Sequence, residues 1–115
     1  QTKYSSSVVR SILHVKSHVD SHYDQGIDTA EAAKNAQMSY GYFSRCFHDI
    51  VGLSFIDYCT QVRMEQAKGQ LANTDNSIQE IAFRVGYNDE KYFSRAFKKY
   101  TGQNPSDYRK LAGSI

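Results

Sequence analysis

The chain has 115 residues, with 14 Lys and Arg against 12 Asp and Glu, and a formal net charge of +2. A chain of this length fits one domain that buries about two-thirds of its unfolded surface around a single core. It contains no run of about 18 apolar residues, and its N-terminus lacks the basic, apolar and small-residue order of a signal peptide. Neither a membrane span nor export is indicated, and we expect a cytoplasmic protein.

Apolar residues recur at intervals of three and four along the chain, which predicts an all-α fold without strands. Serine, aspartate and asparagine at helix starts, and glycine after helix ends, mark the boundaries. We expect seven helices, at about residues 7–23, 29–36, 39–51, 54–72, 77–85, 89–100 and 105–108.

The first helix carries one apolar stripe, and Gly26 is expected to end the helix. The stripe consists of Val8, Ile12, Val15, Val19 and Tyr23. A second row on the same helix holds His14, His18 and His22 at a spacing of four. Neutral imidazoles in such a row could bind zinc, although surface or subunit-contact histidines are the commoner explanation.

The fourth helix is the longest, and at ~1.5 Å per residue it spans roughly 28 Å. Ser54 and Asp57 at its start resemble a capping box. Gly69 lies inside the helix and costs about 1 kcal/mol relative to alanine. We therefore expect a compensating contact or a bend at Gly69.

The tetrapeptide YFSR occurs twice, as residues 42–45 and 92–95. Residues 42–58 align without gaps on residues 92–108 at an offset of 50, whereas the weaker similarity upstream has an offset of 49. The second copy therefore holds one extra residue in its turn. Each copy consists of a short helix, a turn and a second helix, which is the arrangement of a helix-turn-helix.

The second helix of each copy has two different faces. The apolar face is expected to pack inward, with Phe43, Cys46, Phe47 and Ile50 in the first copy and Phe93, Ala96, Phe97 and Tyr100 in the second. The opposite face carries Gly41, Ser44, Arg45 and His48 in the first copy and Lys91, Ser94, Arg95 and Lys98 in the second, with Tyr40 and Glu90 at the N-terminal ends.

The polar faces suit the major groove of DNA. Arginine can make a bidentate contact to guanine, serine can bond several base edges, and lysine reaches phosphates. Either arginine taken alone is more often an ordinary exposed residue. Its repetition at the same place in two helix-turn-helix units favours DNA reading.

Basic charge is concentrated late in the chain. Residues 1–57 hold five Lys and Arg against six Asp and Glu, whereas residues 58–115 hold nine against six. From Lys91 to Lys110 there are six basic residues and one acid, Asp107. This stretch could form a positive face for an anionic partner, with a solvated surface as the alternative.

The sequence resembles the DNA-binding domain of the AraC/XylS-type bacterial transcription regulators over nearly its whole length. The most specific stretch runs from Ser77 to Lys110 and looks like the second helix-turn-helix of that family. Its matching positions are Ile81-Ala82, Val85-Gly86-Tyr87, Tyr92-Phe93, Phe97-Lys98 and Pro105. Arg63 and Ala67 in the long helix also fit the family pattern.

The resemblance implies a single DNA-binding domain over residues 1–115. It would contain two helix-turn-helix subdomains, at about 7–52 and 77–110, joined by a linker helix at about 54–73. The third and sixth helices would enter successive major grooves on one side of the duplex. The length of the linker, ~28 Å, is comparable with the ~34 Å between adjacent groove faces.

The resemblance also implies which residues contact DNA. Base-reading positions are Tyr40, Gly41, Ser44, Arg45, Glu90, Lys91, Ser94 and Arg95. Phosphate contacts are expected from His48, Lys98, Lys99, Asn104 and Arg109. Gln37 stands where the second copy has Gly86, and Gly41 offers no side chain to the bases. We therefore expect the first copy to make fewer base contacts than the second.

Double-stranded DNA is the expected partner, in transcriptional regulation as an activator, with RNA polymerase as a further candidate partner. A sensor or dimerisation domain is expected outside this chain. No set of nucleophile, base and oxyanion-binding groups appears, so we expect neither enzyme activity nor a cofactor. The rival hypothesis is a helical protein-interaction module that uses exposed tyrosines and the basic tail, with or without a metal on His14, His18 and His22.

Overall fold

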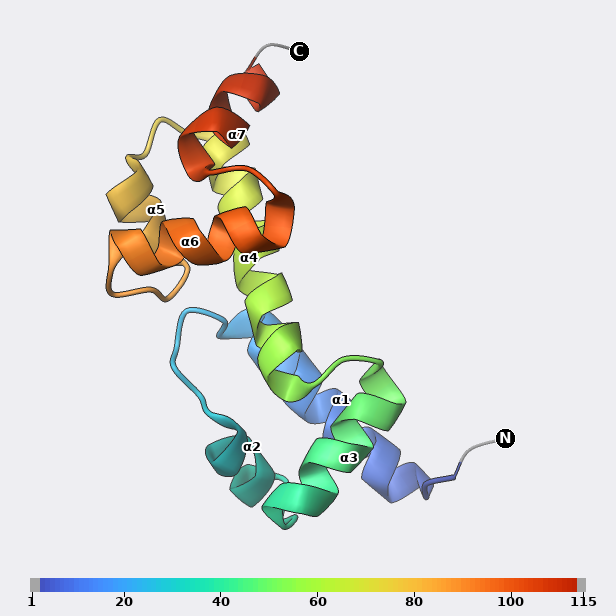
Figure 1. Ribbon diagram of the computed structural model, residues 1–115. Helices are drawn as coiled ribbons and strands as arrows, with labels where there is room; N and C mark the ends of the chain where they lie inside the picture. Colours follow the sequence, from blue (N-terminus) through green and yellow to red (C-terminus); the bar gives the residue numbers. More distant parts are fainter. Residues whose placement is uncertain (1–2, 114–115) are drawn as a thin grey trace. The chain divides into compact units, whose positions relative to one another are not determined.

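A computed structural model describes residues 3–113, which form seven α-helices and no strand (Figure 1). The helices are α1 (Ser6–Ser21), α2 (Thr29–Asn35), α3 (Tyr40–Val51), α4 (Phe55–Asn73), α5 (Ile78–Arg84), α6 (Glu90–Thr101) and α7 (Pro105–Gly113). The predicted all-α fold of seven helices is confirmed. No helix within residues 3–113 is long and apolar enough to cross a membrane.

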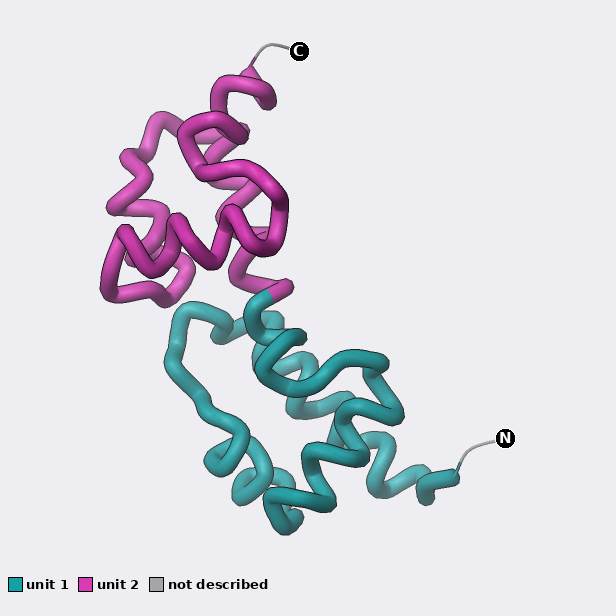
Figure 2. The backbone as a smooth tube through the Cα atoms, viewed as in Figure 1, with its two compact units in different colours: residues 1–60 teal, residues 61–115 magenta. Residues whose placement is uncertain are grey.

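The helices are divided between two compact units (Figure 2). Unit 1 (Gln1–Thr60) contains α1 to α3 and the start of α4, and in it α3 packs against both α1 and α2. Unit 2 (Gln61–Ile115) contains the rest of α4 and α5 to α7, and in it α6 packs against α5 and α7. Each unit therefore holds one helix-turn-helix.

Local capping explains the boundaries of α3 and α6, which are both 12 residues long. The Ser39 hydroxyl accepts a hydrogen bond from the Tyr42 amide, and the Asp89 carboxylate accepts one from the Lys91 amide, each at 3.2 Å. Both helices end at a glycine in the left-handed region, Gly52 at φ 95° and Gly102 at φ 87°. Only glycine adopts this conformation without steric cost, so the predicted ends of both helices are confirmed.

Two predicted helix ends are wrong. The first helix ends at Ser21 rather than near Tyr23, because the backbone leaves the helical conformation at His22, whose amide bonds the carbonyls of His18 and Val19. Gly26 therefore lies in the connection and does not cap α1. The last helix continues to Gly113, well beyond the predicted end at Tyr108.

Two phenylalanines spaced four residues apart form the centre of each unit. Phe43 and Phe47 of α3 are fully buried, and so are Phe93 and Phe97 of α6. The ring centroids of each pair are 5.8 Å apart, and the rings are tilted by 41° in α3 and 43° in α6. The repeated sequence therefore builds the same core geometry twice.

The turn between the two helices of each helix-turn-helix repeats in the same way. In unit 1 the amides of Gln37 and Met38 bond the carbonyls of Lys34 and Ala33. In unit 2 the bonds run from Gly86 to Phe83 and from Tyr87 to Ala82, an offset of 49 residues. The capping residues Ser39 and Asp89 are 50 apart. The extra residue predicted in the second turn is thus confirmed, and it is Asn88.

Gln37 and Gly86 occupy equivalent places in the two turns, but the left-handed backbone there costs glutamine more free energy than glycine. Gln37 is the single non-glycine residue with positive φ in the described chain, at 58°, and Gly86 has φ 106°. An ideal Cβ at Gly86 would lie 3.0 Å from Cζ of Arg63. Left-handed backbone costs a residue with a Cβ about 1 to 2 kcal/mol.

We expect Gln37→Gly to stabilise the protein by about 1 kcal/mol, because glycine removes the left-handed strain. Gly86→Ala should destabilise it by about 1 to 3 kcal/mol through backbone strain and crowding against Arg63. Urea unfolding monitored by circular dichroism measures both changes. Equal effects of the two substitutions would contradict this account of the turns.

Gly69 is the second glycine with a testable cost. It lies inside α4, and a Cβ added there would meet no atom within 4 Å. No close approach of another part of the described chain therefore requires a glycine at this position. We expect Gly69→Ala to raise the free energy of unfolding by about 1 kcal/mol, since alanine lowers the entropic cost of the helix. Loss of stability in urea unfolding would show that the glycine has a role that its surroundings do not reveal.

Candidate nucleic-acid interface

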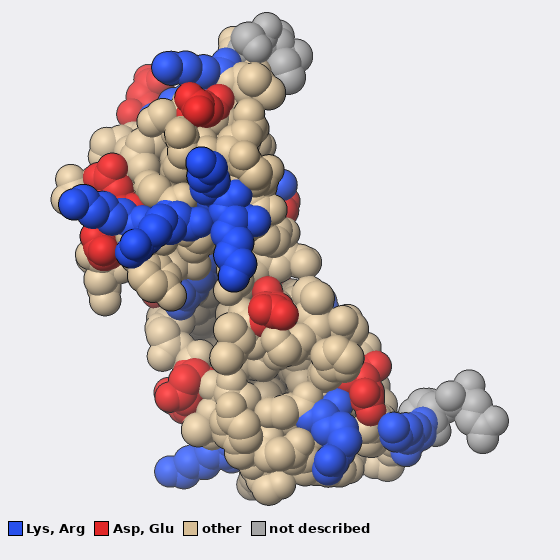
Figure 3. Space-filling model, in the orientation of Figure 1, with Lys and Arg blue, Asp and Glu red and all other residues tan. Residues whose placement is uncertain are grey.

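The outward face of α6 is strongly basic. Lys91, Arg95, Lys98 and Lys99 are all exposed, and within residues 3–113 none of them forms an ion pair. Figure 3 shows basic side chains gathered over the part of unit 2 that α6 contributes. Ser94 is half-buried between them, and Glu90 is exposed at the N-terminal end. Cations without internal partners are available to bind an external anion.

The outward face of α3 has the same layout with less charge. Arg45 is exposed, Ser44 is half-buried, and Gly41 has open space beyond its Cα. Tyr40 at the N-terminal end is 58% exposed. Nδ1 of His48 lies 3.9 Å from the Asp49 carboxylate. The predicted base-reading residues of each unit therefore lie together on one exposed helix face.

The two units differ in total charge. Unit 1 holds five Lys and Arg against six Asp and Glu, whereas unit 2 holds nine against six. The basic excess of the chain therefore belongs to unit 2.

Asn104 and Arg109, two predicted phosphate contacts, have roles inside unit 2. The Asn104 side-chain oxygen accepts the Asp107 amide at 2.9 Å and so caps α7. The Arg109 guanidinium donates to the carbonyls of Leu71 at 3.0 Å and Thr74 at 3.1 Å. These two bonds satisfy carbonyls at the C-terminal end of α4, and they leave Arg109 fewer free N–H groups for a phosphate.

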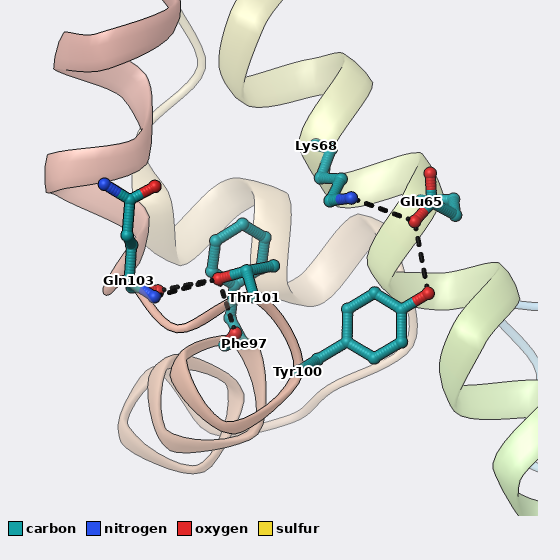
Figure 4. A network of polar contacts seen from close by, with 6 residues as sticks. All are labelled: Glu65, Lys68, Phe97, Tyr100, Thr101 and Gln103. Carbon is teal, nitrogen blue, oxygen red and sulfur yellow. Dashed lines mark hydrogen bonds and ion pairs between the residues drawn. The ribbon is translucent and has the colours of Figure 1, made fainter.

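A polar network connects the end of α6 to α4 within unit 2 (Figure 4). The Tyr100 hydroxyl donates to Oε2 of Glu65 at 3.2 Å, and Nζ of Lys68 lies 3.1 Å from the same oxygen. Lys68 also lies over the Tyr100 ring, 5.6 Å from its centroid. Partial burial, and then the bond to Glu65, raise the pKa of Tyr100, while Glu65 raises the pKa of Lys68.

This network corrects the prediction that Tyr100 packs inward with the phenylalanines. Tyr100 is 40% exposed, and it lies at the edge of the core.

The residue after it, Thr101, closes the turn into α7. Its hydroxyl lies 2.8 Å from the Phe97 carbonyl and 3.0 Å from the Gln103 carbonyl, and it accepts the Gln103 amide at 3.2 Å (Figure 4).

The histidine row on α1 does not assemble a metal site within residues 3–113, where no three His, Cys, Asp or Glu side chains are placed to hold a metal ion. His18 and His22 instead stack, with ring centroids 4.2 Å apart. Nδ1 of His22 lies 3.1 Å from the His18 carbonyl. The imidazole of His22 thus contacts a backbone carbonyl in the last turn of α1.

Comparison with known proteins identifies the family. Residues 32–111 match the model of a family described as a helix-turn-helix domain. The C-terminal domain of AraT, a response regulator from Geobacillus stearothermophilus, superimposes with a TM-score of 0.84 at 36% identity, over 96% of this chain and 88% of that one. The chain belongs to the AraC-type helix-turn-helix family.

Two further relatives of this AraC-type domain are informative. The Msm operon regulatory protein of Streptococcus mutans is 36% identical over 92% of this chain and 38% of its own length. The DNA-binding domain of AdpA, solved in complex with a target DNA, has a TM-score of 0.84 at 26% identity and covers 88% of this chain and 91% of that one. These relatives favour DNA binding over a protein-interaction module. The chain spans less than two-fifths of the length of the curated relatives it matches first.

The structure of this AraC-type domain also gives roles to residues that the sequence pattern left unexplained. The Arg63 guanidinium lies over the Tyr87 ring, 5.4 Å from its centroid, and next to Gly86. Arg63 therefore packs against the turn of the second helix-turn-helix, and Ala67, one helical turn further along α4, is fully buried. The family pattern of an arginine and an alanine four apart indicated these positions, but not their contacts.

Unit 1 of the AraC-type domain has contacts of its own that periodicity could not predict. The Tyr58 hydroxyl donates to the Asp20 carboxylate, and Lys16 lies over the Tyr58 ring at 5.3 Å. Burial, and then Asp20, raise the pKa of Tyr58. At the end of α3, Tyr4 donates to Asp49 at 2.6 Å, which raises the pKa of Tyr4 to about 12 and lowers that of Asp49.

We expect Tyr100→Phe to lower the free energy of unfolding by about 0.5 kcal/mol, since an exposed hydrogen bond contributes the low end of the usual range. Tyr92→Phe is the matched control, because Tyr92 lies on the same helix and is 60% exposed. Its effect should be close to zero. The two variants are compared by urea unfolding, and equal losses would contradict a specific role for the bond between Tyr100 and Glu65.

Proposed function

We propose that this chain reads a specific sequence of double-stranded DNA through α3 and α6, which enter successive major grooves. The observation that carries the proposal is the repeated outward face, in which the same Ser-Arg pair follows a buried phenylalanine in both helices. A helix that presents short polar side chains beside one long arginine can approach base edges closely. The match of residues 32–111 to the helix-turn-helix family supports this use of the two helices.

Each outward residue has a role that follows from its chemistry. Arg45 and Arg95 would make bidentate contacts to guanine, and Ser44 and Ser94 would bond neighbouring base edges. Lys91 would bind guanine or a phosphate, and Glu90 would accept a hydrogen bond from the amino group of cytosine. In α3, Tyr40 and Gly41 would contact the groove by apolar surface and close backbone approach.

Phosphate contacts would come chiefly from unit 2. Lys98 and Lys99 are exposed near the C-terminal end of α6, whereas the corresponding part of α3 offers His48. We expect a smaller contribution from Asn104 and Arg109, because both already bond backbone groups of unit 2. Phosphate contacts give affinity and fix register without selecting a base.

The chain is further proposed to act by binding alone, in the cytoplasm, as part of a longer activator of transcription. The proposal of a longer regulator is supported by the relatives, which are regulatory proteins of more than twice the aligned length. A sensor or dimerisation domain would supply the signal, and RNA polymerase is the proposed second partner.

The roles of arginine and lysine can be separated by experiment. Arg95→Ala should cost ~1 to 3 kcal/mol on the preferred site and relax preference at one base step, because a bidentate contact is lost. Arg45→Ala should act likewise at base pairs about one helical turn away. Lys98→Ala should weaken binding to preferred and random DNA alike. It should also reduce the slope of log affinity against log salt by about one unit, as expected for the loss of one phosphate contact.

Binding of each variant to a randomised duplex library at two salt concentrations measures these effects. Arg10→Ala is the control, since it removes one exposed positive charge from α1, outside both reading helices. No binding of the unaltered chain at low salt would refute the DNA-binding proposal. Uniform losses for Arg45→Ala and Arg95→Ala across all sequences would refute the base-reading roles alone.

A further inference from the structure

A cleft of about 930 Å³ lies in unit 1 between α1 and α2. None of its lining residues belongs to α3, so the DNA-reading face does not account for it. Its volume falls within the range of about 300 to 1,000 Å³ that is typical of small-molecule sites.

The base of the cleft is apolar and comes from four parts of unit 1. Val15 and Val19 line it from α1, Ala32 from α2, Ile27 from the connection between them, and Phe55 from the start of α4. Apart from the half-buried Ile27, all of them are buried. Such a surface favours an apolar ligand body, because burying that body removes apolar area from water.

The rim of the cleft is polar and carries positive charge without negative charge. Arg10, His14 and His18 line it along α1, and no aspartate or glutamate is among the lining residues. Within residues 3–113 the Arg10 guanidinium has no ion-pair partner. Each neutral imidazole still carries one N–H donor. An arginine with hydrogen-bond donors beside it suits a carboxylate or a similar anionic group.

We propose that this cleft binds a small organic anion with an apolar body, such as a carboxylate on an aliphatic or aromatic group. The apolar body would lie on the base of the cleft, and the anionic group would lie at the rim next to Arg10. A cationic ligand is disfavoured because the rim has no acid to neutralise it. The proposal concerns a second site and does not depend on DNA binding.

The position of the cleft gives its occupant a route to the helix-turn-helix. Gln37 also lines it, and this is the residue held at positive φ in the turn that leads into α3. A ligand in the cleft would therefore touch the turn that precedes the reading helix of unit 1.

The test uses a pair of fluorescent probes that share their carbon skeleton, pyrenebutyrate and the uncharged pyrenebutanol. Fluorescence anisotropy should show saturable binding of pyrenebutyrate at one site, with pyrenebutanol about tenfold weaker, as expected for the loss of a charge-assisted hydrogen bond. Amide shifts in nuclear magnetic resonance spectra should move at Ser11, Val19 and Gln37 and stay unchanged in α6.

Variants distinguish probe binding at the charged rim from nonspecific binding. Arg10→Ala should weaken pyrenebutyrate about tenfold and leave pyrenebutanol nearly unchanged. Leu13→Glu should also weaken the anion, because it adds a negative charge to a lining residue that is 47% exposed. Lys34→Ala is the control, since Lys34 is an exposed cation of α2 that does not line the cleft. Thermal unfolding of each variant verifies that the fold is intact.

Equal binding of the two probes, or an Arg10→Ala variant that binds pyrenebutyrate as tightly as the unaltered chain, would overturn the proposal. Failure of both probes to bind would overturn it as well and would favour a protein segment as the occupant of the cleft. Neither result would bear on DNA binding, which is measured separately on the duplex library.

Discussion

The buried pair of phenylalanines in each reading helix is the constraint on which the rest of the site depends. Side chains four residues apart lie on the same face of a helix, so Phe43 with Phe47, and Phe93 with Phe97, fix how each helix is rotated about its axis. Ser44 and Arg45, or Ser94 and Arg95, must then point away from the core. Rotating α6 about its axis by two residues would instead bury Arg95 and Lys99, two like charges without a partner, which costs several kcal/mol. The repeated YFSR is therefore one geometric unit, with the phenylalanine as anchor and the Ser-Arg pair as its exposed consequence.

Local rules explain why most of the fold could be predicted from the sequence. Helix starts at Ser39, Ser77 and Asp89 depend on a side chain bonding an amide two or three residues away, and ends at Gly52 and Gly102 depend on one backbone conformation. Both signals are complete within a few residues. The predicted end of α1 is wrong because the backbone leaves the helical conformation at His22, upstream of the glycine that the sequence pattern indicates as the stop signal.

The exposed faces could be predicted for the same local reason, but the contacts that hold them could not. Tyr100 has its partner 35 residues away at Glu65, and Arg109 reaches carbonyls of Leu71 and Thr74 that are 38 and 35 residues away. No periodicity relates such residues, since their proximity results from the packing of α4 with the helices of unit 2. The same holds for Arg63, whose contact with the turn at Gly86 and Tyr87 requires two separate elements to meet.

The two units have the same kind of buried phenylalanine pair but different outward faces, so the proposed function would be divided unequally between them. Attraction to phosphates acts over about a Debye length and depends on charge, whereas base discrimination requires contact at hydrogen-bond distance. Unit 2 carries the basic excess and four exposed cations on α6, so it would supply most of the attraction. Unit 1 has one arginine on α3, with an exposed tyrosine and a glycine beside it, and could contribute mainly through contacts that form at close range. Because the phenylalanine anchors are the same in both helices, such a division requires changes only on the outward faces and leaves both cores intact.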